Sequence, residues 1–553
     1  MRLEVVLPNG ETKLKEYEDA LTPEELIEEY KDEIEHQVVS CRIKNRDARL
    51  DEVIDEDCVV ELKDMTNPYG NMAYQASLTL LYLKAISDVL GPEVKTTIAN
   101  SLSRGLFTRI HTSGLTDEVA EAIQKRMEEL VEEDTPIKEK VTPREETLEY
   151  LEKRQKNTDE YKLFSTASDL DHAFLATIDD TSSLFYVHTV PSARYLKLFE
   201  VRRYRNGMLL RFPHTSNVDV VPEYVEQKKM YEAFSEETHW ENLMGVTTVG
   251  ELNEKVLSNE LKELIMLSEA LHEKKIAEIA EEIKNAGKRI ILIAGPSSSG
   301  KTTFAKRLII QLRVAGLKPL YLGTDDYFID RENMPVDEEG NMDFEALSAV
   351  DVKLFTEQMN DLLAGKKVDI PEFNFLEGRK EFGKRITSID NSQPIVIEGI
   401  HGLNPELTLG ISDEEKFKIY ISPLTQINID MHHRIPTTDA RMLRRLVRDY
   451  RTRGRDARQT ISDWPSVRKG EEVYIFPYNS EADVFFNSQC LYELAVLKKH
   501  AQPLLKEIGM DEPEYPEAQR MSKFLDCFVS IEDDSIIANN SIIREFIGGS
   551  IIV

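Results

Sequence analysis

The hydrophobic and polar positions along the chain change character from one region to the next. In residues 1–63, apolar and polar positions alternate in short runs at 3–7, 38–43 and 59–62, which is typical of half-buried strands. Helical spacing interrupts these runs at 23–30. The order predicts a small domain in which several strands pack around one helix.

Helical spacing dominates the middle of the chain. It covers 73–90 and then an acidic stretch at 118–133. From 248 to 287, leucine and isoleucine recur at helical intervals among glutamate and lysine, which predicts one or two connecting helices. We expect these helices to pack on the chain's own domains, and a coiled-coil partner helix is the alternative.

Residues 288–510 show a third pattern, because short apolar runs alternate with helical segments. This alternation predicts a mostly parallel sheet covered by helices. The expected strands are 290–294, 318–324, 394–397, 417–422 and 482–486. In such sheets, ligands bind at the carboxyl ends of the strands.

The first of these strands runs into a Gly-x-x-x-x-Gly-Lys-Thr loop followed by a helix. In such a phosphate-binding loop, backbone N–H groups and the helix N-terminus attract phosphates. Lys301 supplies charge to the β- and γ-phosphates, and the Thr302 hydroxyl is placed to ligate Mg²⁺. The alternative is a structural Gly/Ser-rich turn. The expected nucleotide-binding residues are Gly295, Pro296, Ser297, Ser298, Ser299, Gly300, Lys301, Thr302 and Thr303.

Two more features of this region suggest phosphate chemistry. The second strand delivers Asp325 and Asp326 at its end, where a carboxylate can reach a hydroxyl that faces a γ-phosphate. Seven arginines lie between residues 441 and 455, and guanidinium groups bind phosphate oxygens in pairs. We interpret this segment as a lid over phosphates; a solvated basic face or a nucleic-acid contact is the alternative.

Composition narrows the class of protein. Apolar residues make up 41% and charged residues 31% of the 553-residue chain, as in ordinary globular proteins. The net charge of −31 opposes broad binding to nucleic acids or membranes. The N-terminus lacks a signal-peptide pattern, no apolar run nears the ~20 residues of a membrane span, and the four cysteines form no Cys-x-x-Cys pair. We expect a cytoplasmic protein with reduced thiols.

The front half resembles two domains of threonyl-tRNA synthetases. Residues 1–63 resemble the ubiquitin-like TGS domain in length, position and the Leu-Pro-Asn-Gly turn, and an unrelated β-grasp module is the alternative. Residues 64–225 resemble the second additional domain through the helix at 73–90, the segment beginning His111-Thr-Ser-Gly and the acidic helix at 118–133.

That second domain edits mischarged tRNA with a His-x-x-x-His and a Cys-x-x-x-His pair, and this chain has neither. The segment contains only four histidines and no cysteine, so we expect no zinc and no editing. Its histidines are His111, His172, His188 and His214. His188 is then a structural or surface residue, and the domain is a scaffold or binding surface. Transfer RNA is an alternative partner through this half.

Residues 288–505 resemble the uridine kinase and phosphoribulokinase family. Five motifs beyond the loop carry the resemblance: Asp325-Asp326-Tyr327-Phe328, Asn341-Met342-Asp343-Phe344, 370–375, Glu398-Gly399-Ile400 and 444–456. The resemblance implies ATP and Mg²⁺ as cofactors. It also implies transfer of the γ-phosphate to the 5′-hydroxyl of a nucleoside, with uridine or cytidine as the default.

The resemblance also implies individual roles. Asp325 matches the general base and is counted among the Mg²⁺ ligands with Thr302 and Glu398; Asp326 is the alternative base. Asp343 matches the carboxylate that holds the ribose hydroxyls. The implied arginine roles are Arg445 beside Asp343, Arg448 and Arg453 on the phosphates, and Arg455 near the nucleoside.

The base-binding positions depart from the family. Uridine–cytidine kinases hold the pyrimidine with two tyrosines and a histidine, where this chain has Phe328, Phe373 and Gly378. Rings remain for stacking, but the lost hydrogen bonds weaken discrimination. A kinase for another sugar or sugar phosphate is therefore one alternative, and a tRNA- or ribosome-linked regulator is another. A GTPase is disfavoured because no Asn-Lys-x-Asp motif occurs.

The predicted fold is multidomain, α/β and α+β, and we expect a homo-oligomer. The predicted parts are a β-grasp TGS-like domain at 1–63, an editing-like α+β domain at 64–225, a helical connector at 226–287, a P-loop domain with a mostly parallel sheet and a helical Arg-rich lid at 288–510, and a C-terminal extension at 511–553.

Overall fold

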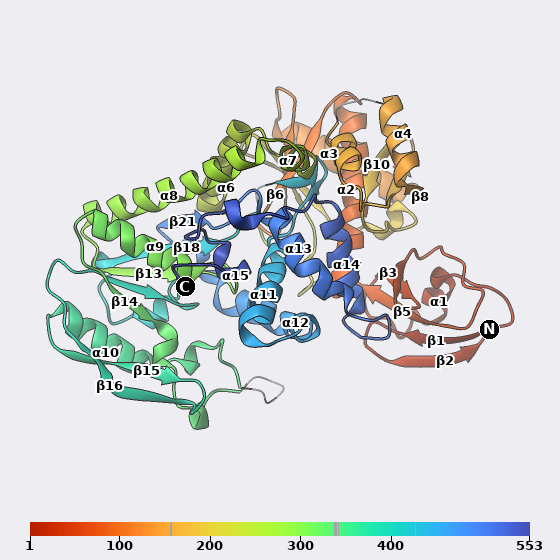
Figure 1. The fold of residues 1–553 in the computed structure, drawn as a ribbon. Coiled ribbons are helices and arrows are strands. Elements are labelled where there is room, and N and C mark those ends of the chain that lie inside the picture. The colour runs from red at the N-terminus through yellow and green to blue at the C-terminus, as the bar shows by residue number, and fades with distance from the viewer. Residues whose placement is uncertain (155–157, 337–339, 341, 426) are drawn as a thin grey trace.

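The computed structural model describes residues 1–154, 158–336, 340, 342–425 and 427–553. Figure 1 shows a small sheet at the N-terminal end, a parallel sheet at the opposite end and helices between them. Among the helices in these ranges, none is both long enough and apolar enough to cross a membrane.

The N-terminal domain is a five-stranded sheet in the order β2-β1-β5-β3-β4, with β1 parallel to β5. Its elements are β1 (Arg2–Val6), β2 (Thr12–Glu16), α1 (Pro23–Glu29), β3 (Val38–Ile43), β4 (Arg46–Ala48) and β5 (Cys58–Asp64). Helix α1 begins with a capping box between Thr22 and Glu25, which satisfies free N–H groups of its first turn. The domain is the predicted mix of strands and one helix, and its TGS assignment stays a prediction.

The second domain contains two antiparallel sheets, β11-β12-β7-β6 and β10-β9-β8. Helix α2 contacts β9 and β10, and α3 contacts α2. The elements are α2 (Pro68–Leu90), β6 (Thr96–Leu102), β7 (Gly105–Ile110), α3 (Asp117–Glu132), β8 (Ile137–Pro143), α4 (Arg144–Arg154), α5 (Asp159–Thr166), β9 (His172–Ile178), β10 (Thr181–Phe185), β11 (Glu200–Tyr204) and β12 (Gly207–Arg211).

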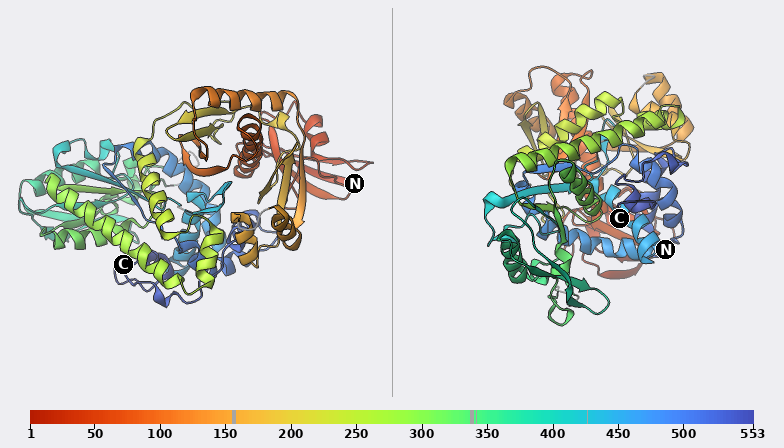
Figure 2. Two further views of the ribbon diagram at one scale, coloured as in Figure 1. Left: turned by 90° about the horizontal axis from the view of Figure 1, so that it is seen from above. Right: turned by 60° about the vertical axis from the view of Figure 1, so that its left-hand side comes forward.

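Three helices connect the front half to the parallel sheet: α6 (Lys228–Met244), α7 (Val249–Leu257) and α8 (Leu261–Ala286). Helix α6 ends at Gly245, whose φ of 64° suits glycine. Two helices lie within 248–287 as predicted, and α8 packs on α9 of the same chain. In both views of Figure 2, the long helix α8 runs beside the parallel-sheet domain.

The C-terminal half contains a five-stranded sheet in the order β14-β17-β13-β18-β21. All neighbouring strands are parallel, and the five predicted strands are these five. Their bounds are β13 (Ile290–Ala294), β14 (Leu320–Gly323), β17 (Ile395–Glu398), β18 (Lys416–Ser422) and β21 (Val484–Asn487). Every residue of β13 is buried, as expected for a central strand covered on both faces.

Helices and two hairpins surround this sheet. The helices are α9 (Lys301–Val314), the 3-10 helix η2 (Thr324–Tyr327), α10 (Val352–Leu363), α11 (Thr437–Arg453), α12 (Ala457–Tyr474), α13 (Glu493–Lys506), α14 (Tyr515–Asp526) and α15 (Arg544–Ile547). The hairpins are β15 (Val368–Asn374) with β16 (Arg379–Thr387), and β19 (Asn428–Asp430) with β20 (His433–Arg434). Helix α11 contains six of the seven arginines of the predicted Arg-rich segment, and Arg455 follows it in the turn before α12.

The hairpin β19–β20 belongs to the C-terminal half but binds the second domain. The Asn428 side chain donates to the Ile98 carbonyl at 2.7 Å, and the Ile98 N–H donates to the Met431 carbonyl at 2.9 Å. Tyr186 of the second domain donates to Asp430 at 2.7 Å. The two halves therefore share an interface of direct hydrogen bonds.

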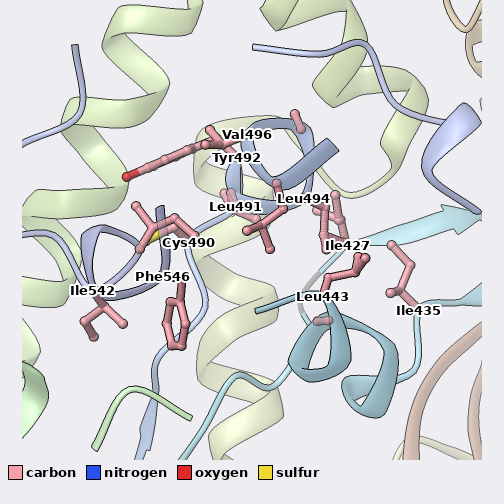
Figure 3. Close-up of a cluster of buried hydrophobic side chains, with 14 of the residues drawn as sticks. Ile427, Ile435, Leu443, Cys490, Leu491, Tyr492, Leu494, Val496, Ile542 and Phe546 are labelled. Atoms are coloured by element: carbon pink, nitrogen blue, oxygen red, sulfur yellow. The ribbon is translucent and has the colours of Figure 1, made fainter. Parts of the chain in front are cut away.

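The C-terminal extension is part of the core of the same half. Ile542 and Phe546 are fully buried, and they belong to the same hydrophobic cluster as Leu443 of α11 and Cys490. Figure 3 shows Ile542, Phe546 and Cys490 close together in that cluster. The segment predicted as a C-terminal extension therefore packs into the hydrophobic core of this half.

Candidate active site

The phosphate-binding loop joins β13 to α9 and lies close to other backbone segments. A Cβ at Gly295 would be 2.0 Å from the Ile421 carbonyl oxygen, so the loop passes directly over β18. Gly300 has a φ of 83°, and a Cβ there would meet the Ile542 side chain at 2.7 Å. Both positions require glycine, because any side chain would push the loop out of this shape.

Two hydroxyl groups of this loop have no hydrogen-bond partner among the described residues. Ser298 and Ser299 are 4% and 0% exposed, and their hydroxyl oxygens are buried without a hydrogen-bond partner among the described residues. Lys301 Nζ donates to the neutral carbonyls of Gly295 at 2.9 Å and Pro296 at 3.1 Å. Burial lowers the pKa of Lys301, while Glu398 and Asp325 act in the opposite direction. Buried hydroxyls beside an ammonium group fit a bound phosphate.

The carboxyl ends of three parallel strands meet at this loop. Glu398 is the last residue of β17 and lies opposite Ile293 of β13 and Gly323 of β14. Its Oε2 accepts a hydrogen bond from the Thr302 hydroxyl at 3.2 Å and another from the Tyr321 hydroxyl at 3.1 Å. The strand order therefore brings Glu398 to the start of α9.

The oxygen pair of Thr302 and Glu398 fits Mg²⁺. In the described part of the chain, no group of three or more His, Cys, Asp or Glu residues could hold a metal alone. Magnesium is commonly bound by one or two carboxylates together with substrate phosphates. A hydroxyl and a carboxylate oxygen next to a phosphate loop match that chemistry.

Two neighbouring aspartates follow β14, and the structure separates their roles. Asp326 pairs with Arg385, with 2.6 Å between Oδ2 and Nη1. Asp325 is exposed. The protein atoms around Asp325 partly desolvate its carboxylate, and this effect, followed by the like charge of Glu398, raises the pKa of Asp325 to about 6. The charge of Lys301 opposes the shift. The side chain still reaches solvent. Asp325 is therefore the aspartate available to a substrate.

Asp343 is fixed by its own loop and by α12. Its Oδ1 accepts the N–H groups of Glu345 at 2.9 Å and Ala346 at 3.1 Å, and its Oδ2 accepts the Tyr474 hydroxyl at 3.0 Å. Asn341 of the same predicted motif lies outside the described residues.

Sequence reasoning missed Glu345. Burial raises the pKa of this carboxyl, while the charges of Lys301 and Arg445 oppose the rise, so Glu345 belongs to the site electrostatically. Its only sequence signal is its position two residues after Asp343.

Two arginines of α11 support the loop from inside the protein. Arg444 is 0% exposed and pairs with Glu493 at 2.5 Å, and its Nη1 donates to the Ser298 carbonyl at 3.2 Å. Arg441 pairs with Glu471 and donates to the Ser297 carbonyl at 2.9 Å. Their charges are used within the protein, so these two arginines are structural.

Three other arginines of the segment gather around one buried carboxylate, Asp449. Arg445, Arg448 and Arg453 lie 3.4, 2.8 and 3.5 Å from its oxygens. Arg445 also donates to the Ser297 hydroxyl of the loop at 3.0 Å. Three guanidinium groups facing one carboxylate leave an excess of positive charge beside the loop, which suits an anion.

The remaining predicted substrate residues are only partly brought together. Arg455 pairs with Asp463 instead of joining the arginines around Asp449. Phe328 and Phe373 contact edge to face at 5.7 Å, but they are 7% and 6% exposed, so little of either ring is open for stacking. The nearby ring of Phe375, 5.1 Å from Phe373, is 56% exposed. Phe375 closes the predicted 370–375 motif, and that motif was its only sequence signal.

The base-reading position at Gly378 is covered by another side chain. A Cβ there would lie 2.8 Å from the side chain of Arg331. Arg331 also donates to the Phe375 carbonyl at 2.7 Å. A guanidinium group therefore stands where the resemblance places an imidazole.

Comparisons with known proteins agree with this geometry. The model of the "Phosphoribulokinase / Uridine kinase family" matches residues 290–494. A uridine kinase from Staphylococcus aureus (strain Newman) is 30% identical over 197 residues, which are 35% of this chain and 85% of that protein. The chain belongs to the phosphoribulokinase and uridine kinase family. The match includes the phosphate loop, both aspartates, Glu398 and α11, so this region is a kinase domain.

One more curated protein and one solved structure are similar to part of the chain. A uridine kinase from Ligilactobacillus salivarius is 28% identical over 196 residues, or 35% of this chain and 83% of its own length. A solved structure described as "a Possible Uridine Kinase from Bacillus stearothermophilus" is 21% identical, covers 38% of this chain and 97% of its own, and has a TM-score of 0.27. The family match ends at residue 494, before α14 and α15.

The four histidines of the second domain have separate partners. His188 Nδ1 lies 2.7 Å from Glu139, His111 bonds Thr97, His172 bonds Asp171 and His214 bonds Ser216. The Glu139 carboxylate is 2% exposed and also accepts from the Thr189 N–H and hydroxyl. His188 is therefore part of a buried hydrogen-bond network, which is a structural role.

Proposed function

We propose that the protein is an ATP-dependent kinase that transfers the γ-phosphate to the 5′-hydroxyl of a nucleoside, with uridine or cytidine as the default substrate. One observation supports this most strongly. Asp325 stands accessible at the phosphate loop, while its neighbour Asp326 is neutralised by Arg385. A carboxylate at that place can accept the proton of a hydroxyl that attacks the γ-phosphate.

Each part of the site has a task in this reaction. The backbone of 295–300 and Lys301 would hold the phosphates, and Thr302 with Glu398 would hold Mg²⁺, which neutralises phosphate charge when bound. The arginines around Asp449 would stabilise charge on the transferring group. Asp325 orients the acceptor hydroxyl and takes its proton. Asp343, held by Tyr474, offers carboxylate oxygens to the sugar hydroxyls.

A second substrate class has support in the same site. Phe328 and Phe373 are mostly buried, and Arg331 covers the position of the base-reading histidine. A cation in place of a neutral hydrogen-bonding group favours an acceptor that carries negative charge, such as a sugar phosphate. A kinase for a sugar or sugar phosphate is therefore the alternative.

A substrate panel tests this proposal. The full chain is incubated with ATP and Mg²⁺ and one acceptor at a time, and ADP release and the phosphorylated product are measured. We expect one acceptor with a free primary hydroxyl to stand out, and the Asp325→Asn variant serves as the matched control with an intact phosphate loop. Equal, background-level ADP release with every nucleoside and sugar would contradict the proposal.

A further inference from the structure

The C-terminal segment places a carboxylate on the phosphate-binding helix. Glu545 of α15 accepts a hydrogen bond from the Thr303 hydroxyl at 2.5 Å and from the Thr303 backbone N–H at 3.3 Å. Thr303 stands in the first turn of α9, where the free N–H groups and the helix dipole attract anions. The Glu545 carboxylate thus accepts hydrogen bonds from both donors of Thr303, a residue that we expect to bind nucleotide.

This contact is held in place by a well-packed segment. Phe546 is 0% exposed, and Ile542 packs directly against Gly300 of the loop. Arg451 of α11 donates to the carbonyls of Glu545 at 2.9 Å and Phe546 at 3.1 Å. Figure 3 shows Ile542 and Phe546 pointing into the shared core. The backbone of α15 is therefore anchored, and the Glu545 side chain is the part that can turn.

A phosphate and a carboxylate cannot both use the Thr303 donors fully. In phosphate loops of this kind, backbone N–H groups around the start of the helix cradle phosphate oxygens. The Glu545 carboxylate is an acceptor of the same charge sign at the same donors. Even when it turns aside, its charge stays near the phosphates and repels them.

We propose that Glu545 belongs to the nucleotide site and limits its affinity for ATP, because its carboxylate takes the place of a nucleotide phosphate at Thr303. The role of Glu545 rests on the proposed function, because it takes ATP as the nucleotide that binds this site. Family motifs alone would not identify the residue, since the family match ends at 494.

The test is direct titration of the full chain with ATP and Mg²⁺ by calorimetry, without any acceptor. Glu545→Gln keeps the shape of the side chain and removes its charge. We expect it to bind ATP about 3- to 10-fold more tightly, which corresponds to the ~1 kcal/mol typical of a charge at a helix N-terminus. The matched control is Glu532→Gln, which removes an exposed carboxylate from the same C-terminal segment and should leave the affinity unchanged.

Salt separates charge repulsion from a packing effect. The affinity ratio between Glu545→Gln and wild type should shrink as salt rises from about 0.05 M to about 0.5 M, because screening weakens repulsion. Thermal unfolding of the variant checks that the loop still folds. Unchanged or weaker ATP binding by Glu545→Gln would overturn the proposal.

The same titration separates this proposal from the proposed function. A substrate panel without any phosphorylated product would contradict the kinase assignment, yet the titration would still report on Glu545. ATP binding by neither protein would contradict both.

Discussion

Two regions of the molecule treat a carboxylate in opposite ways. In the second domain, burial alone would raise the pKa of Glu139, but His188, the Thr189 N–H and Arg49 together lower it. At the phosphate loop, partial desolvation and the negative charge of nearby Glu398 raise the pKa of Asp325 to about 6. The protein stabilises the charged form of Glu139, whereas it disfavours the charged form of Asp325.

Glu139 is paired by the protein and has a structural role, whereas the polar groups of the candidate site are free to meet a ligand. Buried polar atoms in folded proteins are almost always paired, so an unpaired group calls for an explanation. Like Asp325, Ser298 and Ser299 lie at the phosphate loop, and their buried hydroxyls have no hydrogen-bond partner among the described residues. The following changes test this distinction, from the largest expected effect to the smallest.

Lys301→Ala should abolish measurable phosphoryl transfer, with a loss of about 10³-fold or more, because its ammonium group is the cation on the β- and γ-phosphates. The fold should survive, since the hydrogen bonds that Lys301 makes with the described residues go to two carbonyls of its own loop. The rate of ADP release and circular dichroism measure the two effects. Near-normal turnover would place the phosphate site elsewhere.

Asp325→Asn should lower kcat by about 10²–10⁴-fold with little loss of ATP affinity, as expected when a general base is removed. Asp326→Asn is the matched control and should act mainly through its lost pairing with Arg385. Steady-state kinetics of both variants decide the assignment. The reverse order of effects would make Asp326 the base.

Glu398→Gln should raise the Mg²⁺ concentration needed for half-maximal activity by about 10-fold or more, because losing even a residue that only supports a metal ligand costs about 10- to 100-fold. The Thr302 hydroxyl would keep an oxygen partner in the amide, so the loop should hold its shape. A Mg²⁺ titration of the initial rate measures this. An unchanged requirement would exclude Glu398 from the metal site.

The reaction should lose activity below about pH 6. A general base works only when deprotonated, and Asp325 becomes protonated as the pH falls through its pKa of about 6. One pH unit below that value the rate should be about a tenth of its plateau. The pH profile of kcat/KM measures this loss of activity at acidic pH, and the Asp325→Asn variant should no longer show it.

His188→Ala should leave phosphoryl transfer unchanged within about twofold and destabilise the second domain by about 1–3 kcal/mol, because buried Glu139 loses a hydrogen-bond partner. Denaturant unfolding and the kinase assay measure the two effects side by side. A loss of bound zinc or of deacylation activity in this variant would instead restore the editing hypothesis.

The sequence predicted the parallel sheet well and the small edge strands poorly. Strand β13 is a continuous apolar run because both of its faces are covered, so its pattern is strong. Strand β2 reads Thr-Lys-Leu-Lys-Glu and is mostly exposed, so nothing in it signals burial. The hairpin β19–β20 is short and depends on contacts with the second domain for its position.

The candidate site was predictable where its residues follow one another along the chain. The phosphate loop and Asp325 lie at strand ends, and the roles expected of them came from the loop motif and from the family resemblance. The contact of Glu545 with Thr303 joins residues 242 positions apart, and no local pattern encodes it. The arginine run predicted an anion site, but only packing shows that Arg441 and Arg444 are buried and committed to the loop.

The hydrogen bonds between Ile98 and the hairpin β19–β20 have a consequence for synthesis on the ribosome. Asn428 follows its partner Ile98 by 330 residues. At about 5–20 residues per second, strand β6 therefore emerges roughly 17–66 s before the hairpin β19–β20 has been synthesised. During that time β6 is the open edge of its sheet, and such an edge can pair with another chain. A front half synthesised alone would never receive this partner.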